Sequence, residues 1–133
     1  MRTILSHAGL AAYCARNPAD GERERHGDSI SWIFDGEYRI SCELASGGDL
    51  LLEARVIELP QDQRLADETL AEAMQCLAFR VHEHAEALVL SENEDILLIQ
   101  QTVAADADVD AFESSLERFI NALANWRQAF FPG

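Results

Sequence analysis

The stretch that decides the fold is Ile30–Leu59, ISWIFDGEYRISCELASGGDLLLEARVIEL, in which apolar and polar residues alternate over three segments. The alternation is cleanest over Tyr38–Leu44, where every second residue is apolar. Asp35-Gly36 is typical of a two-residue hairpin turn, because glycine tolerates the positive φ that this turn requires. Ser46–Asp49 turns the chain again, and connections this short join antiparallel strands. The stretch therefore predicts a three-stranded antiparallel meander.

Helical spacing of apolar residues appears on both sides of the meander. Helices are predicted over Ile4–Ala15, from Asp67 to about Glu83, and from just after Ala105 to about Phe130. The polar stretch Ala19–Asp28, with two glycines and charges of both signs, is typical of an exposed loop. The predicted strands are Ile30–Phe34, Tyr38–Leu44, Leu50–Leu59, Ala87–Ser91 and Ile96–Val103.

The order of these segments is helix, three strands, helix, two strands, helix, within a single domain of residues 1–133. Strands that follow one another directly, with helices segregated from them, favour an α+β architecture. We therefore predict a five-stranded antiparallel sheet with helices packed on one face, in the order α-βββ-α-ββ-α.

Charge excludes several classes of partner. The chain carries 24 Asp and Glu against 10 Arg and no Lys, a formal net charge of −14. Nucleic acids and anionic membranes bind basic surfaces, which so few cations cannot form. No apolar run approaches the roughly 20 residues that cross a bilayer, and the N-terminus lacks the pattern of a secretory signal. We expect a cytoplasmic protein with no nucleic-acid partner and no membrane insertion.

Acidic residues at the start of the last predicted helix have the spacing of a calcium-binding loop. The oxygen-ligand spacing of an EF-hand is matched by Asp106, Asp108, Asp110 and Glu117. However, Ala111 stands where that loop requires glycine for its sharp turn. Carboxylates are favourable at the positive end of a helix dipole, and Asp110 with Glu113 has the spacing of a capping box. The better interpretation is a helix N-terminus without metal.

Histidine and cysteine residues offer no catalytic arrangement. His82 and His84 lie two positions apart at the end of a predicted helix, where they point in different directions and cannot share a metal ion unless the helix has ended. The three cysteines, Cys14, Cys42 and Cys76, are widely spaced and odd in number, which favours buried free thiols. The chain has no nucleophile motif and no phosphate-binding loop. We expect no metal, no cofactor and no enzymatic activity.

Apolar surface remains as the candidate for function. If helices cover one face of the sheet, alternation places Ile33, Leu51 and Ile57 on the other, among polar and charged neighbours. Large apolar groups on an uncovered face mark an interaction site. The alternative is that a second protomer, or the helix Ile4–Ala15, covers them.

Two late segments resemble a known family. ALVLSENEDILLIQQTV, residues 87–103, reads as two strands around an acidic turn, and DVDAFESSLERFINALANWRQAF, residues 108–130, as a helix with a stripe of aromatic and leucine residues. Together with the order of elements and the acidity, they are similar to the class I chaperones of bacterial type III secretion. The similarity is best over Ile30–Phe131, while the first helix is short and rich in alanine.

The resemblance implies a homodimer in the bacterial cytoplasm. It would bind the N-terminal region of a secreted effector, here called the client, and keep it soluble and competent for secretion without ATP. In the family, the client is extended, inserts apolar side chains into surface patches and can pair with a sheet edge. Mapped by element, the resemblance implies client contacts at Leu5, Ile33, Leu51 and Ile57. It implies dimer contacts at Leu70, Met74, Leu77, Val81, Leu88 and Leu90.

Two other interpretations stay open at this point. A regulatory adaptor of the same fold would sequester another secretion-system protein or a regulator instead of escorting an effector. A small enzyme would act without any protein partner, through an acid or histidine in a cleft. The identity of the bound partner separates the first of these from a chaperone.

Overall fold

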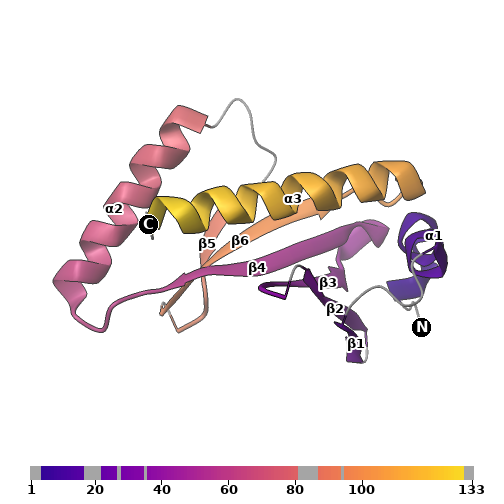
Figure 1. The fold of residues 1–133 in the computed structure, drawn as a ribbon, viewed down its shortest axis with the longest axis horizontal. Coiled ribbons are helices and arrows are strands. Elements are labelled where there is room, and N and C mark those ends of the chain that lie inside the picture. The colour runs from indigo at the N-terminus through magenta and orange to yellow at the C-terminus, as the bar shows by residue number, and fades with distance from the viewer. Residues whose placement is uncertain are drawn as a thin grey trace.

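The computed structural model describes residues 4–16, 22–26, 28–34, 36–80, 87–93 and 95–130 (Figure 1), with the backbone alone at 22–26, 73–80 and 129–130. Its helices are the short 3-10 helices η1 (Ile4–Ser6) and η2 (Ser46–Gly48) and the α-helices α1 (Ala8–Arg16), α2 (Gln63–Arg80) and α3 (Val109–Phe130). Its strands are β1 (Glu22–His26), β2 (Ser29–Phe34), β3 (Tyr38–Leu44), β4 (Leu50–Glu58), β5 (Ala87–Leu90) and β6 (Ile96–Val103).

The strands form one antiparallel sheet in the order β1-β2-β3-β4-β6-β5. The predicted meander is β2, β3 and β4, and the later hairpin adds β6 beside β4 with β5 outside it. Every predicted strand is present, and α1 and α3 pack on one face of the sheet (Figure 1). The predicted α+β fold is therefore confirmed.

The sheet also has a strand that was not predicted. β1 lies within Ala19–Asp28, whose composition predicts a loop, and that prediction is wrong over residues 22–26. β1 pairs with β2 from Glu22↔Ile33 to His26↔Ser29. Its sequence, ERERH, has no apolar residue, so it carries no alternation to detect. The edge of β2 offers main-chain hydrogen bonds to any neighbouring strand, whatever its side chains.

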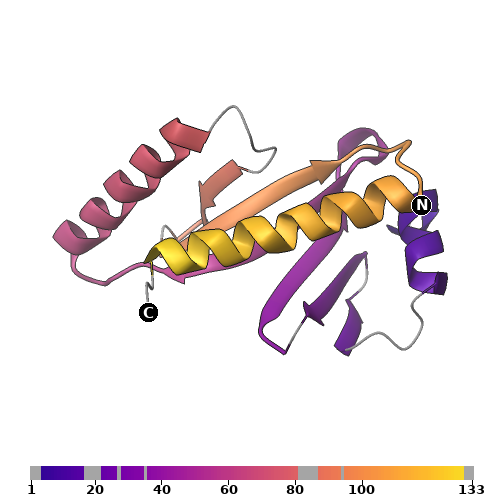
Figure 2. The same ribbon diagram turned by 45° about the horizontal axis from the view of Figure 1, so that its top comes forward.

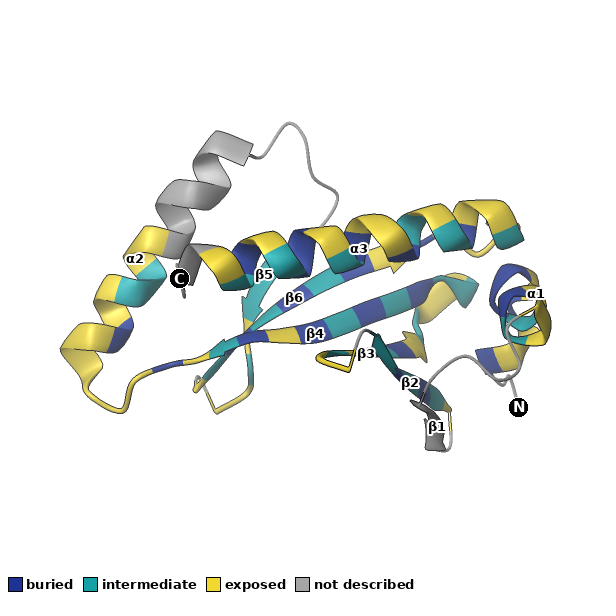
Figure 3. Ribbon diagram, in the orientation of Figure 1, coloured by how far each residue is buried: buried dark blue, intermediate teal, exposed yellow. Residues whose placement is uncertain are grey.

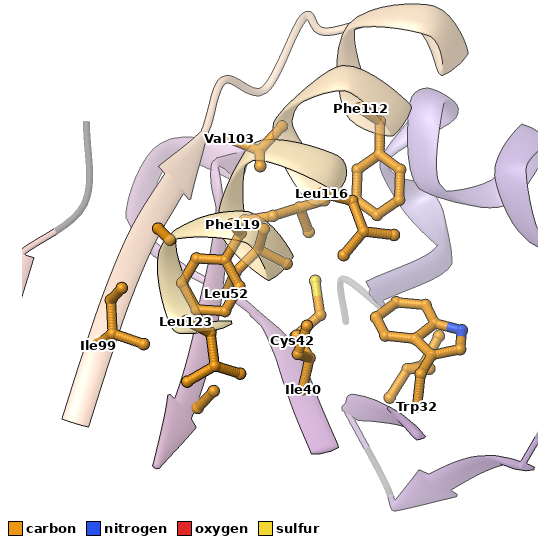
Figure 4. Packing of buried hydrophobic residues seen from close by; sticks show 14 of the residues in the cluster. Trp32, Ile40, Cys42, Leu52, Ile99, Val103, Phe112, Leu116, Phe119 and Leu123 are labelled. Carbon is orange, nitrogen blue, oxygen red and sulfur yellow. The ribbon is translucent and has the colours of Figure 1, made fainter. Parts of the chain in front are cut away.

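α3 lies lengthwise across one face of the sheet, as Figures 1 and 2 show. Its buried side chains recur at helical spacing and are Phe112, Leu116, Phe119, Leu123 and Trp126. Figure 4 shows Leu116 and Phe119 facing Cys42 of β3 and Leu52 of β4. The opposite side of α3 is exposed (Figure 3). Burial of this apolar stripe holds the helix on the sheet.

The N-terminus of α3 confirms the helical interpretation of the acidic residues but corrects the capping residue. Oδ1 of Asp108 accepts a hydrogen bond from the N–H of Ala111 at 2.8 Å. Asp108 is therefore the N-cap, and Asp110 lies inside the first turn. Asp110 and Glu113 instead pair with Arg16 of α1, at 3.5 and 3.2 Å.

α1 packs against the N-terminal end of α3, on the same side of the sheet. The ring of Tyr13 lies 6.1 Å from that of Trp32 and 5.2 Å from that of Phe112, between ring centroids. Gly9 approaches α3 so closely that a Cβ there would lie 2.5 Å from the carbonyl oxygen of Ala107. A side chain at this position would force α1 away from α3.

The side chain of His7 connects the start of α1 to the loop before α3 through two hydrogen bonds. Its Nδ1 accepts a hydrogen bond from the N–H of Leu10 at 3.2 Å, and its Nε2 donates one to the carbonyl oxygen of Ala104 at 2.7 Å. The two bonds together require a neutral ring with its proton on Nε2. The ring is buried, and each of its nitrogens has a hydrogen-bond partner within the protein, as buried polar atoms require.

α2 begins at Gln63, earlier than the predicted Asp67, because Asp62 caps it. Oδ1 of Asp62 accepts hydrogen bonds from the N–H of Arg64 at 2.9 Å and of Leu65 at 3.2 Å. Ala66 is buried, whereas the other described side chains of α2 are exposed or half-buried (Figure 3). Figure 2 shows α2 lying apart from α3.

Candidate functional site

The face of the sheet away from α1 and α3, here called the open face, is the candidate functional site. Strand pairing assigns to it Ser29, Ser31 and Ile33 of β2, Arg39, Ser41 and Glu43 of β3, Leu51, Glu53, Arg55 and Glu58 of β4, Ala87 and Val89 of β5, and Ile96, Leu98, Gln100 and Thr102 of β6. Because α1 packs on the opposite face, the helix Ile4–Ala15 does not cover the open face. That alternative is excluded.

Ile33 and Leu51 both lie on the open face, as alternation predicts, and both are half-buried. They are not neighbours. Ile33 stands opposite Arg39 near one end of β3, whereas Leu51 stands opposite Glu43 near the other end. The two side chains are thus separate apolar positions on a polar face, suited to a ligand that crosses several strands.

Ile57 lies on the core face, so the predicted placement on the open face is wrong. The pairing of β4 with β6 runs from Arg55↔Leu98 to Ile57↔Leu97, which leaves Val56 as an extra residue in a β-bulge. Leu97 is buried in the core, and a residue directly opposite it shares its face. Ile57 accordingly packs against the core. The bulge reverses the alternation after Arg55.

Leu5 does not belong to the open face. It lies in η1, two residues before the buried His7, and is 37% exposed. It remains an exposed apolar side chain beside α1, so a ligand that contacts both Leu5 and the open face would have to pass around the edge of the sheet.

A further apolar group on the open face was not predicted. Leu98 stands opposite Val89 on one side and Arg55 on the other, and Ile96 follows on the same face. All three apolar side chains are half-buried. The signal was available in ILLIQQTV, where residues 96 and 98 alternate with buried residues 97 and 99. Together they give the β5–β6 side of the open face more apolar side chains than the side of β2, which has Ile33.

A depression of about 310 Å³ lies on the open face, and we refer to it as the arginine depression. Its lining consists of Arg39, Ser41, Glu53, Ala54, Arg55, Ser91, Ile96, Leu98 and Arg127. Arg127 comes from α3 on the core side and reaches the depression between β3 and β4. The depression therefore combines apolar, hydroxyl and guanidinium groups in one place.

The predicted dimer residues lie around α2 and the edge strand β5. Leu88 and Leu90 stand opposite Ile99 and Leu97, which places them on the core face at the sheet edge, where Leu90 is 39% exposed. Leu70 of α2 is half-buried and packs against the core. The side chains of Met74 and Leu77 lie outside the described residues, as does the whole of Val81.

Two observations concern metal-ligating and thiol groups in the described part of the chain. Within them, no group of three His, Cys, Asp or Glu side chains is placed to hold a metal ion. Burial raises the pKa of the Cys42 thiol to about 12, with smaller contributions from Cys14 and Glu43. A thiol of that pKa is protonated at neutral pH and a poor nucleophile. His82 and His84, and the side chain of Cys76, lie outside the described residues.

None of the described helices is long and apolar enough to span a bilayer. The core contacts of α1 and α3 account for their apolar residues.

Comparison with known families identifies the fold. The model of the Tir chaperone protein (CesT) family matches residues 25–127. The chain belongs to this family. The resemblance to type III secretion chaperones is thereby confirmed. No curated protein matches the chain.

Solved structures of similar fold include three complexes. The ExsC–ExsE complex gives a TM-score of 0.64 at 18% identity, with 90% of this chain and 88% of the other covered. The HopA1–SchA chaperone–effector complex gives 0.63 at 15% identity, covering 90% and 91%. The Yersinia pestis type III secretion chaperone SycH, solved with a stable fragment of YscM2, gives 0.62 at 13% identity, covering 93% and 99%.

Proposed function

We propose that this member of the Tir chaperone family binds an N-terminal segment of a type III secreted effector in the bacterial cytoplasm and keeps it soluble and competent for secretion without ATP. The observation that carries the proposal is the open face, where Ile33, Leu51 and Leu98 stand on a sheet whose helices pack on the other side. An extended client lying there would bury these side chains, and burial on the order of 25 cal/mol per Å² would offset part of the cost of ordering it.

The proposal includes a homodimer held by α2 and β5. The residues proposed for its interface are Leu70, Met74, Leu77, Val81, Leu88 and Leu90. The exposure of Leu90 at the sheet edge supports it, because an uncovered edge strand with apolar side chains is a usual site of protein contact. Light scattering of Met74→Glu tests it. A dimer should fall to the 14.8 kDa mass of one chain, whereas an unchanged dimer mass would place the interface elsewhere.

Client binding is tested by affinity capture from the native cytoplasm, with the bound proteins identified by mass spectrometry. The tagged wild-type chain should retain a secreted protein through a short N-terminal segment. Ile33→Asp and Leu51→Asp should release it, because each puts a carboxylate where an apolar side chain of the client would pack. Ser114→Asp adds the same charge at an exposed position of α3 and should retain the client.

The outcomes separate the competing interpretations. Capture of a regulator that is not secreted would favour the adaptor. Equal capture by the wild type, Ile33→Asp and Leu51→Asp would remove the open face from the proposal. Loss of the circular dichroism signal in either variant would show that residue to be needed for folding.

A further inference from the structure

The arginine depression stands out against the charge of the chain. The protein has ten arginines and a formal net charge of −14, yet three arginines line this one depression. Glu53 is the carboxylate among its lining residues. Its lining residues therefore include three guanidinium groups and one carboxylate, on a strongly acidic protein. Two further acids lie beside the lining: Asp95 accepts a hydrogen bond from Ser91 at 2.9 Å, and Glu58 is paired with Ile96.

Arg127 owes its position to a split in the sheet. β3 and β4 pair from Leu44↔Leu50 to Ser41↔Glu53, and beyond that point no pairing joins their described residues. Arg127 bridges the gap: its Nε and Nη2 donate to the carbonyl oxygen of Arg55 at 3.3 and 2.9 Å, and its Nη1 donates to that of Glu37 at 3.2 Å. These acceptors are neutral, so they fix the guanidinium without cancelling its charge.

Arg39 and Arg55 bring two further charges to the rim. Both are exposed, and in the described part of the chain neither side chain forms a hydrogen bond or an ion pair. Other arginines do find acids, as Arg16 does on α3. Glu53 is turned to β6, where its Oε2 accepts a hydrogen bond from Nε2 of Gln100 at 2.7 Å.

We propose that the arginine depression binds the carboxylate of an Asp or Glu side chain in the client segment that lies on the open face. This inference rests on the proposed function and adds the chemistry of one client position. Guanidinium groups bind carboxylates through paired, charge-assisted hydrogen bonds. Arg39 and Arg55 supply free donors, while Arg127 adds its fixed positive charge.

The apolar residues that line the depression indicate which client residues should flank the acidic residue. Ile96 and Leu98 line it directly. In an extended peptide, side chains on the same side are about 7 Å apart. An acidic residue in the depression would therefore place residues two positions away over apolar side chains. The favoured segment is apolar–x–acidic–x–apolar in an extended conformation.

The net charge of the protein argues for a single carboxylate and against a polyanion. Charges are screened beyond about 8 Å at physiological ionic strength, so one carboxylate senses mainly the local guanidinium groups. A nucleic acid would extend beyond the depression over a protein of net charge −14 and be repelled. The depression is thus selective by its small size.

Two blocked peptides that differ in one group test the inference. Acetyl-Ser-Leu-Ser-Glu-Ser-Leu-Ser-amide and its Gln counterpart are titrated into the wild-type protein, and arginine Nε–Hε and backbone NMR signals are followed. The Glu peptide should bind at least about tenfold more tightly, a difference of about 1.4 kcal/mol. It should shift the signals of Arg39 and Arg55. Raising the salt concentration should shrink the difference.

Substitution completes the test. In the double variant Arg39→Gln/Arg55→Gln, the preference for Glu should fall to about threefold or less, a weakening expected when charge-assisted hydrogen bonds are lost. Arg118→Gln removes one charge from an exposed position of α3 and should keep the preference. Equal affinities for both peptides, or no shift of the arginine signals, would overturn the inference. The proposed function would survive that result if Ile33→Asp still abolished client capture.

Discussion

The two faces of one sheet follow the same alternation but have opposite characters. On the core face, Ile40, Cys42, Leu52 and Ile99 are fully buried beneath α3. On the open face, the intervening positions hold serine, arginine, glutamate and glutamine, with apolar residues at intervals. The core face is continuous because its partner is part of the same chain. The open face is interrupted, as expected of a surface that faces water in the single chain.

The largest contrast between the faces should appear on truncation. Phe119→Ala removes a fully buried ring at the centre of α3 and should lower the free energy of unfolding by about 3–5 kcal/mol. Ile33→Ala on the open face should cost less than about 1.5 kcal/mol, because its side chain is already partly in water. Urea unfolding at one fixed protein concentration measures both, since dimer formation would make stability depend on concentration. Equal costs would show that the open face is covered within the protein.

The bulge at Val56 provides a sharper test, because it moves a single residue from one face to the other. Ile57→Asn should lower the free energy of unfolding by about 2 kcal/mol, since it places an amide against the core. Leu51→Asn, on the open face, should cost less than half as much. The same urea experiment compares them. If Leu51→Asn proves the more costly, the register after Arg55 is not the one described.

These two faces also show how far sequence reasoning reaches. The alternation of Tyr38–Leu44 and the stripe from Phe112 to Trp126 were decisive, because each places apolar residues at one clear period. β1 was missed because its five charged or polar residues include no apolar residue and so show no apolar period. Ile57 was misplaced because Val56 and Ile57 are both apolar, so nothing in their order marks the residue at which alternation reverses.

The arginine depression lay beyond sequence reasoning for a different reason. Arg127 is 72 residues from Arg55 and 90 from Glu37, the residues whose carbonyl oxygens it contacts. In the sequence, Arg127 is a polar residue that directly follows Trp126, and no periodic or motif pattern marks it as part of a site. The depression arises where β3 and β4 part, which depends on the packing of α3 over the sheet. Such sites require the tertiary structure to be found.

The contact between α1 and α3 predicts a smaller change in the free energy of unfolding. Its sign shows whether the two helices are in close contact. In an isolated helix, Gly→Ala is favourable by about 1 kcal/mol. Gly9→Ala should instead lower the free energy of unfolding by about 1–2 kcal/mol, because the added methyl group meets the carbonyl oxygens of Ala107 and Asp108. Ala12→Gly, at an exposed position of the same helix, is the control and should cost about 1 kcal/mol. A stabilising Gly9→Ala would mean that α1 does not press against α3.

The last prediction concerns the core face alone. The free energy of unfolding should depend on pH through the buried thiol of Cys42. Burial raises the pKa of this thiol from 9.0 to about 12 in the folded protein, so the folded state holds its proton more tightly than the unfolded state does. The resulting stability is complete below pH 9 and is lost as the pH rises toward 12, by up to about 1.4 kcal/mol per pH unit.

Comparing wild type with Cys42→Ala isolates this dependence from other groups that titrate at high pH. Both proteins are unfolded with urea at intervals between pH 8 and 10.5. The wild type should lose stability faster than the variant above pH 9, although the variant starts lower because it leaves a cavity. Parallel pH profiles would mean that the thiolate is tolerated at residue 42, and hence that water reaches the core face beneath α3. The contrast between a closed and an open face would then be one of degree, with α3 able to lift from the sheet.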